Sequence, residues 1–227
     1  MTLVSADPRI YLLDQSYSFP DPREANDPEG LVAVGGDLSP MRLLSAYRRG
    51  IFPWFTYRRM PYWFSPNPRL VLEPSRFHLS KSLQRVIQSG KFEIRYDTAF
   101  ADVITKCAAI KREGQHGTWI TKPFIESYTQ LHTMGYAHSV ETYYYGRLVG
   151  GLYGVQVGRL FCGESMFSIM SDASKVALHA LVLQSLEWEF ELIDCQVPTD
   201  HLQRMGAEVM DREHFLQRIS QLQERML

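Results

Sequence analysis

Two polar side chains lie two positions apart inside an apolar segment near the end of the chain. The segment reads Leu-Ile-Asp-Cys-Gln-Val and places Asp194 and Gln196 at positions i and i+2. On a β-strand this spacing predicts both side chains on one face, with Ile193, Cys195 and Val197 on the other face as core. A carboxylate and an amide in such a setting need hydrogen-bond partners, because an unsatisfied buried polar group costs ~1–3 kcal/mol. The pair therefore indicates either a reactive site or a network that only fixes the strand.

A second carboxylate has a similar setting. Glu164 lies in the segment Phe-Cys-Gly-Glu-Ser-Met-Phe-Ser, between aromatic and sulfur-bearing neighbours. Carboxylates in apolar surroundings often have shifted pKa values and mark sites, although structural ion pairs produce the same shifts. Cys162 and Cys195 are alternative candidates as nucleophiles. Neither has a histidine or a basic residue beside it in sequence, and a buried free thiol is usually inert, so this alternative is disfavoured.

Basic residues are concentrated in one part of the chain. The formal net charge is −1, but residues 1–41 sum to −5, residues 42–95 to +9 and residues 96–227 to −5. The basic segment is also aromatic, and it includes Phe52, Trp54, Phe55, Tyr57, Tyr62, Trp63, Phe64 and Phe77. Basic groups bind phosphates and aromatic faces stack on unpaired bases, so the segment is consistent with nucleic-acid binding. A solvated arginine surface over an aromatic core explains the same pattern.

Composition narrows the class of protein. The chain has 227 residues, 45% of them hydrophobic and 22% charged, which are globular values that allow one large domain or two modest ones. No segment approaches the ~18 consecutive apolar residues of a membrane span, and residues 1–14 have no apolar run typical of a secretory signal. Three widely spaced cysteines and scattered histidines predict neither a disulfide framework nor a metal site. We expect a cytoplasmic protein that needs no metal.

Periodicity and breaker residues predict the elements that must position these side chains. Helices are expected over residues 39–50, 80–88, 97–110, 121–135 and 171–189. Strands are expected over 91–96, 138–145, 147–157, 159–167 and 191–197, and the segment 199–227 is mostly helix with a short strand near 207–210. The proline-rich segment 51–69 is predicted as an ordered loop with short strands, and 111–117 as a polar loop. This order predicts an α+β layered fold.

Seven multi-residue motifs, in order along the chain, resemble those of the bacterial leucyl/phenylalanyl-tRNA–protein transferases. They are Gly35–Pro40, Arg49–Phe55, Trp63–Arg69, Gly117–Thr121, Ala137–Glu141, Phe161–Ser168 and Asp194–Val197. The resemblance implies a small N-terminal domain, residues 1–62, followed by an acetyltransferase-like (GNAT-type) domain, residues 63–227. It also implies transfer of Leu, Phe or, less readily, Met from an aminoacyl-tRNA to the N-terminal Arg or Lys of an acceptor protein, without ribosome or ATP. The product would carry a degradation signal of the N-end rule.

The resemblance assigns roles to individual residues. Asp194 and Gln196 would be the catalytic pair, with Asp194 orienting the Gln196 amide so that its oxygen accepts a hydrogen bond from the attacking amine. Trp54 and Trp119 would stack on the terminal adenosine of the tRNA, and Glu164 would meet that adenosine or the aminoacyl amine. An apolar pocket for the aminoacyl side chain would be lined by Leu152, Phe161, Met166, Leu178, Leu181 and Ile193. Most of these six residues would be core in any fold.

Further residues complete the expected site. The phosphates of the acceptor stem would be contacted by Arg42, Arg48, Arg49, Arg58, Arg59, Arg69, Arg76, Lys81 and Arg85. Thr199 and Leu181 depart from the family pattern, which has Asn and Phe at these positions, so we expect one substrate contact and the Leu-to-Phe preference to differ from those of the family. No cofactor is expected, and the protein is expected to act as a monomer. The sequence alone does not identify the residues that hold the acceptor Arg or Lys, nor the physiological acceptors.

Two alternatives come from other classes of protein. An acyl-CoA-dependent N-acetyltransferase needs a Q/R-x-x-G-x-G/A loop to hold pyrophosphate, and the nearest segments, 147–152 and 203–208, end in Leu and Glu. A non-catalytic RNA-binding module would not require Asp194 and Gln196.

Overall fold

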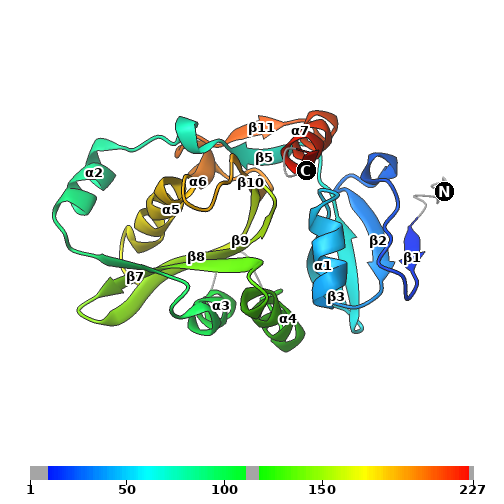
Figure 1. The fold of residues 1–227 in the computed structure, drawn as a ribbon, viewed down its shortest axis with the longest axis horizontal. Helices are drawn as coiled ribbons and strands as arrows, with labels where there is room; N and C mark the ends of the chain where they lie inside the picture. The colour runs from blue at the N-terminus through cyan, green and yellow to red at the C-terminus, as the bar shows by residue number, and fades with distance from the viewer. Residues whose placement is uncertain (1–9, 111–117, 225–227) are drawn as a thin grey trace, which may run out of the picture.

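Two β-sheets organise the chain in a computed structural model that describes residues 10–110 and 118–224 (Figure 1). The small sheet has the strand order β1-β2-β4-β3. Its strands are β1 (Tyr11–Leu13), β2 (Leu31–Gly35), β3 (Phe52–Tyr57) and β4 (Met60–Phe64). Strands β1 and β2 are parallel and the other pairs are antiparallel. Helix α1 (Pro40–Tyr47) connects β2 to β3 and lies between the two sheets.

The large sheet has seven strands in the order β11-β5-β10-β9-β8-β7-β6. Its strands are β5 (Arg69–Leu72), β6 (Glu93–Tyr96), β7 (Ala137–Tyr144), β8 (Arg147–Val157), β9 (Leu160–Ser168), β10 (Leu192–Gln196) and β11 (Glu208–Met210). All neighbouring pairs are antiparallel except β9 and β10, which run parallel. Helix α5 (Ala173–Gln184) makes the crossover that a parallel pair requires.

Helices cover both faces of the large sheet. Those not yet named are α2 (Lys81–Gln88), α3 (Phe100–Ala109), α4 (Lys122–Thr133), α6 (Asp200–Gln203) and α7 (Arg212–Glu224), with short 3₁₀ turns at Pro22–Glu24 and Pro74–Arg76. Residues of α3 and α4 belong to one hydrophobic cluster, and residues of α2 and α5 to another. The arrangement is therefore helix, sheet, helix in layers, as an α+β fold requires.

The small sheet and the large sheet share one core. The first hydrophobic cluster contains Tyr47 of α1 and Trp63 of β4 together with Phe124 of α4 and Phe215 of α7. The C-terminal helix α7 lies beside β5 and next to the small sheet (Figure 1). The expected division at Tyr62 falls inside β4 and stays a prediction.

Most of the predicted helices and strands are confirmed. Helix α1 begins after Ser39 with Pro40 in its first turn, and the chain leaves it through Gly50 at φ +70°. Helix α3 begins later than predicted, and neither Asp97 nor Thr98 caps it. The fully buried carboxylate of Glu141 instead accepts hydrogen bonds from the Thr98 hydroxyl and from the Ala99 backbone amide. A residue of β7 therefore provides the hydrogen-bond acceptor for the backbone at the start of the helix.

Other expectations differ from the structure. Helix α5 ends at Gln184 rather than near 189. The short strands predicted in the proline-rich segment are confirmed, and they pair as the hairpin β3–β4. Pro53 is tolerated there because it lies on an edge strand at a register shift, where its missing N–H is not needed. Strand β5 was not expected, since four residues give no clear period. The predicted loop 111–117 and the first nine residues lie outside the described ranges.

Candidate active site

One cavity of about 380 Å³ gathers the residues expected to bind substrate. All ten of them line it: Trp54, Trp119, Leu152, Phe161, Glu164, Met166, Leu178, Leu181, Ile193 and Thr199. They come from both sheets, because Trp54 lies on β3 and the others lie in or beside the large sheet. Residues up to 145 positions apart in the chain therefore surround one space.

The apolar wall of the cavity is the edge of the second hydrophobic cluster. Leu178 and Leu181 lie on one face of α5, at i and i+3, and are 3% and 1% exposed. They line the cavity together with Phe161 of β9 and Ile193 of β10, which belong to the same cluster. The wall can bury an apolar side chain of leucine or phenylalanine size, with ~25 cal/mol gained per Å² removed from water.

Gln196 lies at an irregularity in β10. The register against β5 shifts between Asp194 and Gln196, and Gln196 has φ +66°. This bulge breaks the alternation that the sequence predicts. Gln196 consequently lines the cavity together with Ile193 and Cys195, whereas Asp194 is not among the residues that line it. The prediction that Asp194 and Gln196 share a face opposite Ile193 and Cys195 is wrong.

Asp194 is buried behind the cavity and paired with Arg69. Arg69 Nε and Nη2 donate to the two carboxylate oxygens at 2.8 and 2.6 Å, and both residues are 1% exposed. The guanidinium lies between the rings of Phe52 and Phe215, at 4.9 and 4.6 Å from their centroids. Asp194 Oδ1 also accepts from the Gln196 backbone amide at 2.9 Å. Asp194 thus holds the backbone of the bulge.

The Gln196 side chain is oriented by Glu164 and not by Asp194, which corrects the sequence-based expectation. Gln196 Nε2 donates to Glu164 Oε1 at 2.8 Å. A carboxylate oxygen accepts this contact, so the amide nitrogen faces Glu164 and the amide oxygen is left for another donor.

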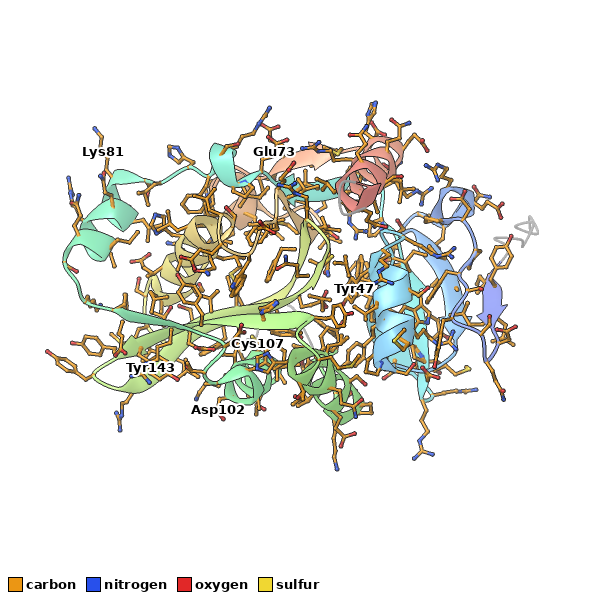
Figure 2. All side chains as sticks on the ribbon, in the orientation of Figure 1. Tyr47, Glu73, Lys81, Asp102, Cys107 and Tyr143 are labelled. Carbon is orange, nitrogen blue, oxygen red and sulfur yellow. The ribbon has the colours of Figure 1, made fainter. Side chains whose placement is uncertain are left out.

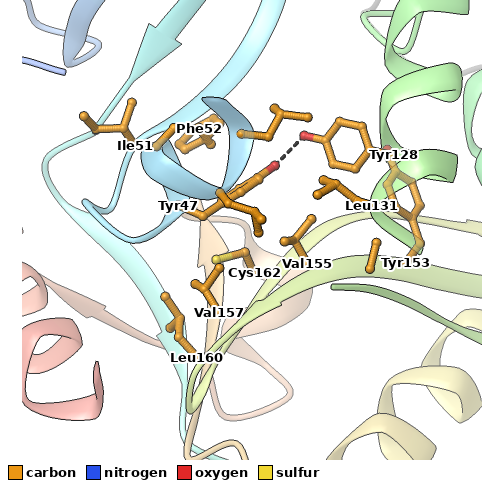
Figure 3. Packing of buried hydrophobic residues seen from close by; sticks show 14 of the residues in the cluster. Tyr47, Ile51, Phe52, Tyr128, Leu131, Tyr153, Val155, Val157, Leu160 and Cys162 are labelled. Atoms are coloured by element: carbon orange, nitrogen blue, oxygen red, sulfur yellow. Dashed lines mark hydrogen bonds between the residues drawn. The ribbon is translucent and has the colours of Figure 1, made fainter. Parts of the chain in front are cut away.

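Glu164 is held by two tyrosines that the sequence analysis missed. Tyr47 OH donates to Oε1 at 2.7 Å and Tyr128 OH to Oε2 at 3.1 Å. The two phenol oxygens also contact each other (Figure 3). Burial raises the pKa of Glu164 to about 7, against the opposing effect of these donors. Burial likewise raises the pKa of both tyrosines, so they stay protonated.

No sequence signal links these tyrosines to Glu164. Tyr47 lies on the buried face of α1, and Tyr128 lies on α4. The three residues are brought together because α1 packs against α4, and the two hydroxyl groups reach Glu164 of β9.

The two tryptophans are partly exposed and each is supported by a phenylalanine. The Trp54 ring packs edge-on against the Phe64 ring, with 5.1 Å between their centroids. The Trp119 ring packs in the same way against the Phe124 ring, with a centroid distance of 5.3 Å. Both line the cavity, so they offer faces on which a base can stack. Thr199 lines it too, and its hydroxyl accepts from the Leu202 amide at 3.3 Å as the cap of α6.

The basic segment does not form one surface. Arg42 and Arg69 are 0% and 1% exposed, so the expectation that they contact phosphates is wrong. Arg42 pairs instead with Asp37 and donates to the Asp14 carbonyl oxygen. The other seven basic residues are exposed, and they are Arg48, Arg49, Arg58, Arg59, Arg76, Lys81 and Arg85. Lys81 lies at the end of the molecule that is farther from the small sheet (Figure 2).

Other chemistries find little support among residues 10–110 and 118–224. Burial raises the pKa of Cys162 and of Cys195, which makes both thiols poor nucleophiles. These residues contain no group of three or more His, Cys, Asp or Glu side chains able to hold a metal ion. In the same part of the chain, no helix combines the length and apolar character needed to span a bilayer.

The chain is similar in sequence to members of one family. The family model described as leucyl/phenylalanyl-tRNA protein transferase matches residues 71–220, and the model of its N-terminal domain matches residues 36–67. A leucyl/phenylalanyl-tRNA–protein transferase of Myxococcus xanthus is 52% identical over 91% of this chain and 89% of its own. One of Dechloromonas aromatica is 54% identical over 86% and 84%.

Similarity to solved structures is weaker. An aminoglycoside acetyltransferase from an uncultured soil metagenomic sample is 14% identical, with a TM-score of 0.40 over 51% of this chain and 84% of that protein. The α+β class rests on the strands and helices described above, and the small N-terminal domain on its family match.

Proposed function

The chain belongs to the leucyl/phenylalanyl-tRNA–protein transferase family, and we propose that the cavity beside Gln196 is where it joins an aminoacyl group to a protein. The enzyme is a transferase that takes its aminoacyl group from a tRNA and passes it to a protein N-terminus. The finer assignment, to acceptors that begin with Arg or Lys and products read by the N-end rule, is part of the proposal. The proposal also includes a monomeric enzyme that works in the cytoplasm, where aminoacyl-tRNAs are found.

One observation carries the proposal. The ten residues expected to bind the aminoacyl-adenosine end line the same cavity as Gln196, whose amide oxygen is left for another donor. In this assignment Leu152, Phe161, Met166, Leu178, Leu181 and Ile193 hold the aminoacyl side chain. Trp54 and Trp119 stack on the terminal adenosine, and Thr199 lies at the rim.

The proposed reaction needs little chemical activation by the protein. Conversion of an ester to an amide is downhill, so neither ATP nor a metal is required. An α-amine with a pKa of about 7.7–8.0 is partly neutral near neutral pH. Gln196 would accept a hydrogen bond from the attacking amine and align it on the ester carbonyl, and Asp194 would act as a positioning residue through the Gln196 backbone.

Transfer of labelled leucine tests the proposal. Purified protein should move leucine from leucyl-tRNA to a peptide that begins with Arg, without ATP or coenzyme A. The same peptide with an acetylated N-terminus is the matched control, because it lacks the nucleophile. Acetyl transfer from acetyl-coenzyme A to the peptide would instead support the acyl-CoA alternative, which the relatives do not favour.

A further inference from the structure

Three oxygen-bearing groups form a closed ring at the wall of the cavity. Tyr47 from α1 and Tyr128 from α4 each contact a different oxygen of Glu164, and their hydroxyl groups contact each other (Figure 3). Tyr47 and Tyr128 are 1% and 0% exposed and do not line the cavity, whereas Glu164 does. The ring is therefore reached from the substrate side only through its carboxyl group.

The ring has more contacts than the phenols have hydrogens. Three oxygen–oxygen contacts close it, and each needs one hydrogen between the oxygens. Tyr47 and Tyr128 supply two, since each phenol has a single O–H. The third can come only from a protonated Glu164. With that proton in place, Glu164 donates to Tyr128, Tyr128 donates to Tyr47, and Tyr47 donates back to Glu164. The geometry fits a site that receives a proton.

We propose that Glu164 accepts the proton that the acceptor amine must lose, and that Tyr47 and Tyr128 are positioning residues that prepare the carboxylate to take it. This inference rests on the proposed function. Gln196 donates its amide N–H to Glu164, so an amine held by the Gln196 oxygen lies next to the carboxylate. An amide cannot itself carry the proton away at neutral pH, and Glu164 can.

The acceptor ammonium group gives one proton to the Glu164 carboxylate and becomes a neutral amine. The amine lone pair forms a C–N bond to the ester carbonyl carbon, and the ester C–O bond breaks. A second N–H proton moves to the leaving ribose oxygen of the tRNA. The products are an amide, a free tRNA hydroxyl group and a protonated Glu164, which returns its proton to water.

The electrostatic setting supports a proton acceptor that works near neutrality. Burial raises the pKa of Glu164 to about 7, and the donors Tyr47, Tyr128 and Gln196 limit the rise. Asp194 also raises this pKa through its negative charge. The remaining titratable groups packed around the ring are Cys162 of β9, which acts on Tyr47, and Tyr153 of β8, which acts on Tyr128. A carboxylate with a pKa close to the working pH is well matched to proton transfer.

A pH profile of single-turnover transfer tests the inference. The assay uses leucyl-tRNA and one Arg-initiated peptide, so the acceptor amine contributes equally in every variant. We expect the wild-type rate to rise through an inflection near 7. Glu164→Gln should lose that inflection and react ~10²–10⁴-fold more slowly, with its affinity for leucyl-tRNA measured separately. Tyr47→Phe and Tyr128→Phe should each move the inflection upward by about one pH unit, because each removes a donor to the charged carboxylate.

Two controls separate this role from a structural one. Tyr96→Phe removes a phenol that donates to the Ala180 carbonyl oxygen and touches no member of the ring, so it should leave the profile unchanged. An infrared carboxylic-acid band that disappears near pH 7 in the free wild type, and is absent in Glu164→Gln, would support the inference even if the variant reacts too slowly to assay.

The outcomes are distinct. If Glu164→Gln transfers leucine at the wild-type rate with the same inflection, Glu164 is not the acceptor, and the proposed function stands. The same holds if His201→Asn, at a histidine that also lines the cavity, removes the inflection and Glu164→Gln does not. If the wild type transfers no leucine, the proposed function fails and the inference fails with it.

Discussion

Arg69 and Asp194 form a two-point ion pair that is buried directly behind Gln196, with N–O distances of 2.8 and 2.6 Å. Asp194 in turn accepts the backbone N–H of Gln196. The pair links β5, an element without a clear sequence signal, to the bulge that points Gln196 into the cavity. Arg69 therefore serves the site from inside the protein and not as a phosphate ligand.

Removal of Arg69 should be costly. Arg69→Met leaves the Asp194 carboxylate buried without its partner, and we expect a loss of ~3–5 kcal/mol in the free energy of unfolding. Chemical denaturation measures it. Adding Asp194→Leu to this variant should recover stability but not transfer activity, which would separate folding from positioning. Arg76→Ala, which loses only exposed ion pairs, should leave the free energy of unfolding close to the wild-type value.

Truncation of Gln196 should affect the chemical step. Gln196→Ala removes the amide oxygen that aligns the amine, and we expect the single-turnover rate to fall ~10²–10⁴-fold with little change in affinity for aminoacyl-tRNA. Gln203→Ala, on an exposed face of α6, is the matched control. Near-normal turnover of Gln196→Ala would remove Gln196 from the mechanism.

The size of the apolar wall should set the choice between leucine and phenylalanine. Leu181→Phe adds volume inside the cavity, so transfer of phenylalanine should fall about tenfold relative to leucine. Competition between leucyl-tRNA and phenylalanyl-tRNA measures the ratio. Leu183→Phe makes the same change on the same helix at a position that is 62% exposed, and it should leave the ratio unaltered.

Exposed arginines should account for the salt dependence of tRNA binding. Arg58 and Arg59 occupy the turn of the β3–β4 hairpin, next to the strand that carries Trp54. If each contacts one phosphate, the variant Arg58→Ala with Arg59→Ala should bind tRNA more weakly and reduce the slope of log K against log salt by about two. Titrations at several salt concentrations give the slope. An unchanged slope would place tRNA elsewhere, for instance nearer to Lys81 and Arg85.

Stability should depend on pH through Glu164. Its pKa is raised from 4.5 in the unfolded chain to about 7 in the folded protein, so the folded state binds its proton more tightly. The resulting stabilisation is complete below about pH 4.5 and is lost as the pH rises through about 7. The difference in unfolding free energy between wild type and Glu164→Gln should therefore shrink by ~3 kcal/mol over that window. A constant difference would mean that the carboxyl group is solvated.

The sequence predicts the wall of the site better than its centre. Trp54, Trp119, Phe161 and Met166 could be placed because they lie within the family motifs, and the other four apolar lining residues because the resemblance extends to the segments between the motifs. The bulge at Gln196 could not be predicted, since alternation along a strand assumes regular pairing, and pairing with β5 is a tertiary property. Tyr47 and Tyr128 were missed for the same reason.

Charge was the least reliable sequence signal. Arg42 and Arg69 belong to the same basic segment as Arg58 and Arg59, yet the first two are buried and paired with carboxylates. A count of charges along the chain cannot distinguish a cation held by a distant aspartate from one open to a phosphate, because its partner is 125 residues away in the case of Arg69.

The hydrophobic cluster that joins Tyr47 and Trp63 to Phe124 and Phe215 limits how far this protein is modular. Two family models divide the chain between residues 67 and 71, as if the parts could be exchanged. Their interface is interior, however, and one of its tyrosines reaches the reacting carboxylate. A hybrid that joins the N-terminal part of one relative to the C-terminal part of another should therefore fold well only if the residues on both sides of this cluster come from one parent. Recombination within the family should accordingly favour crossovers that keep this core intact.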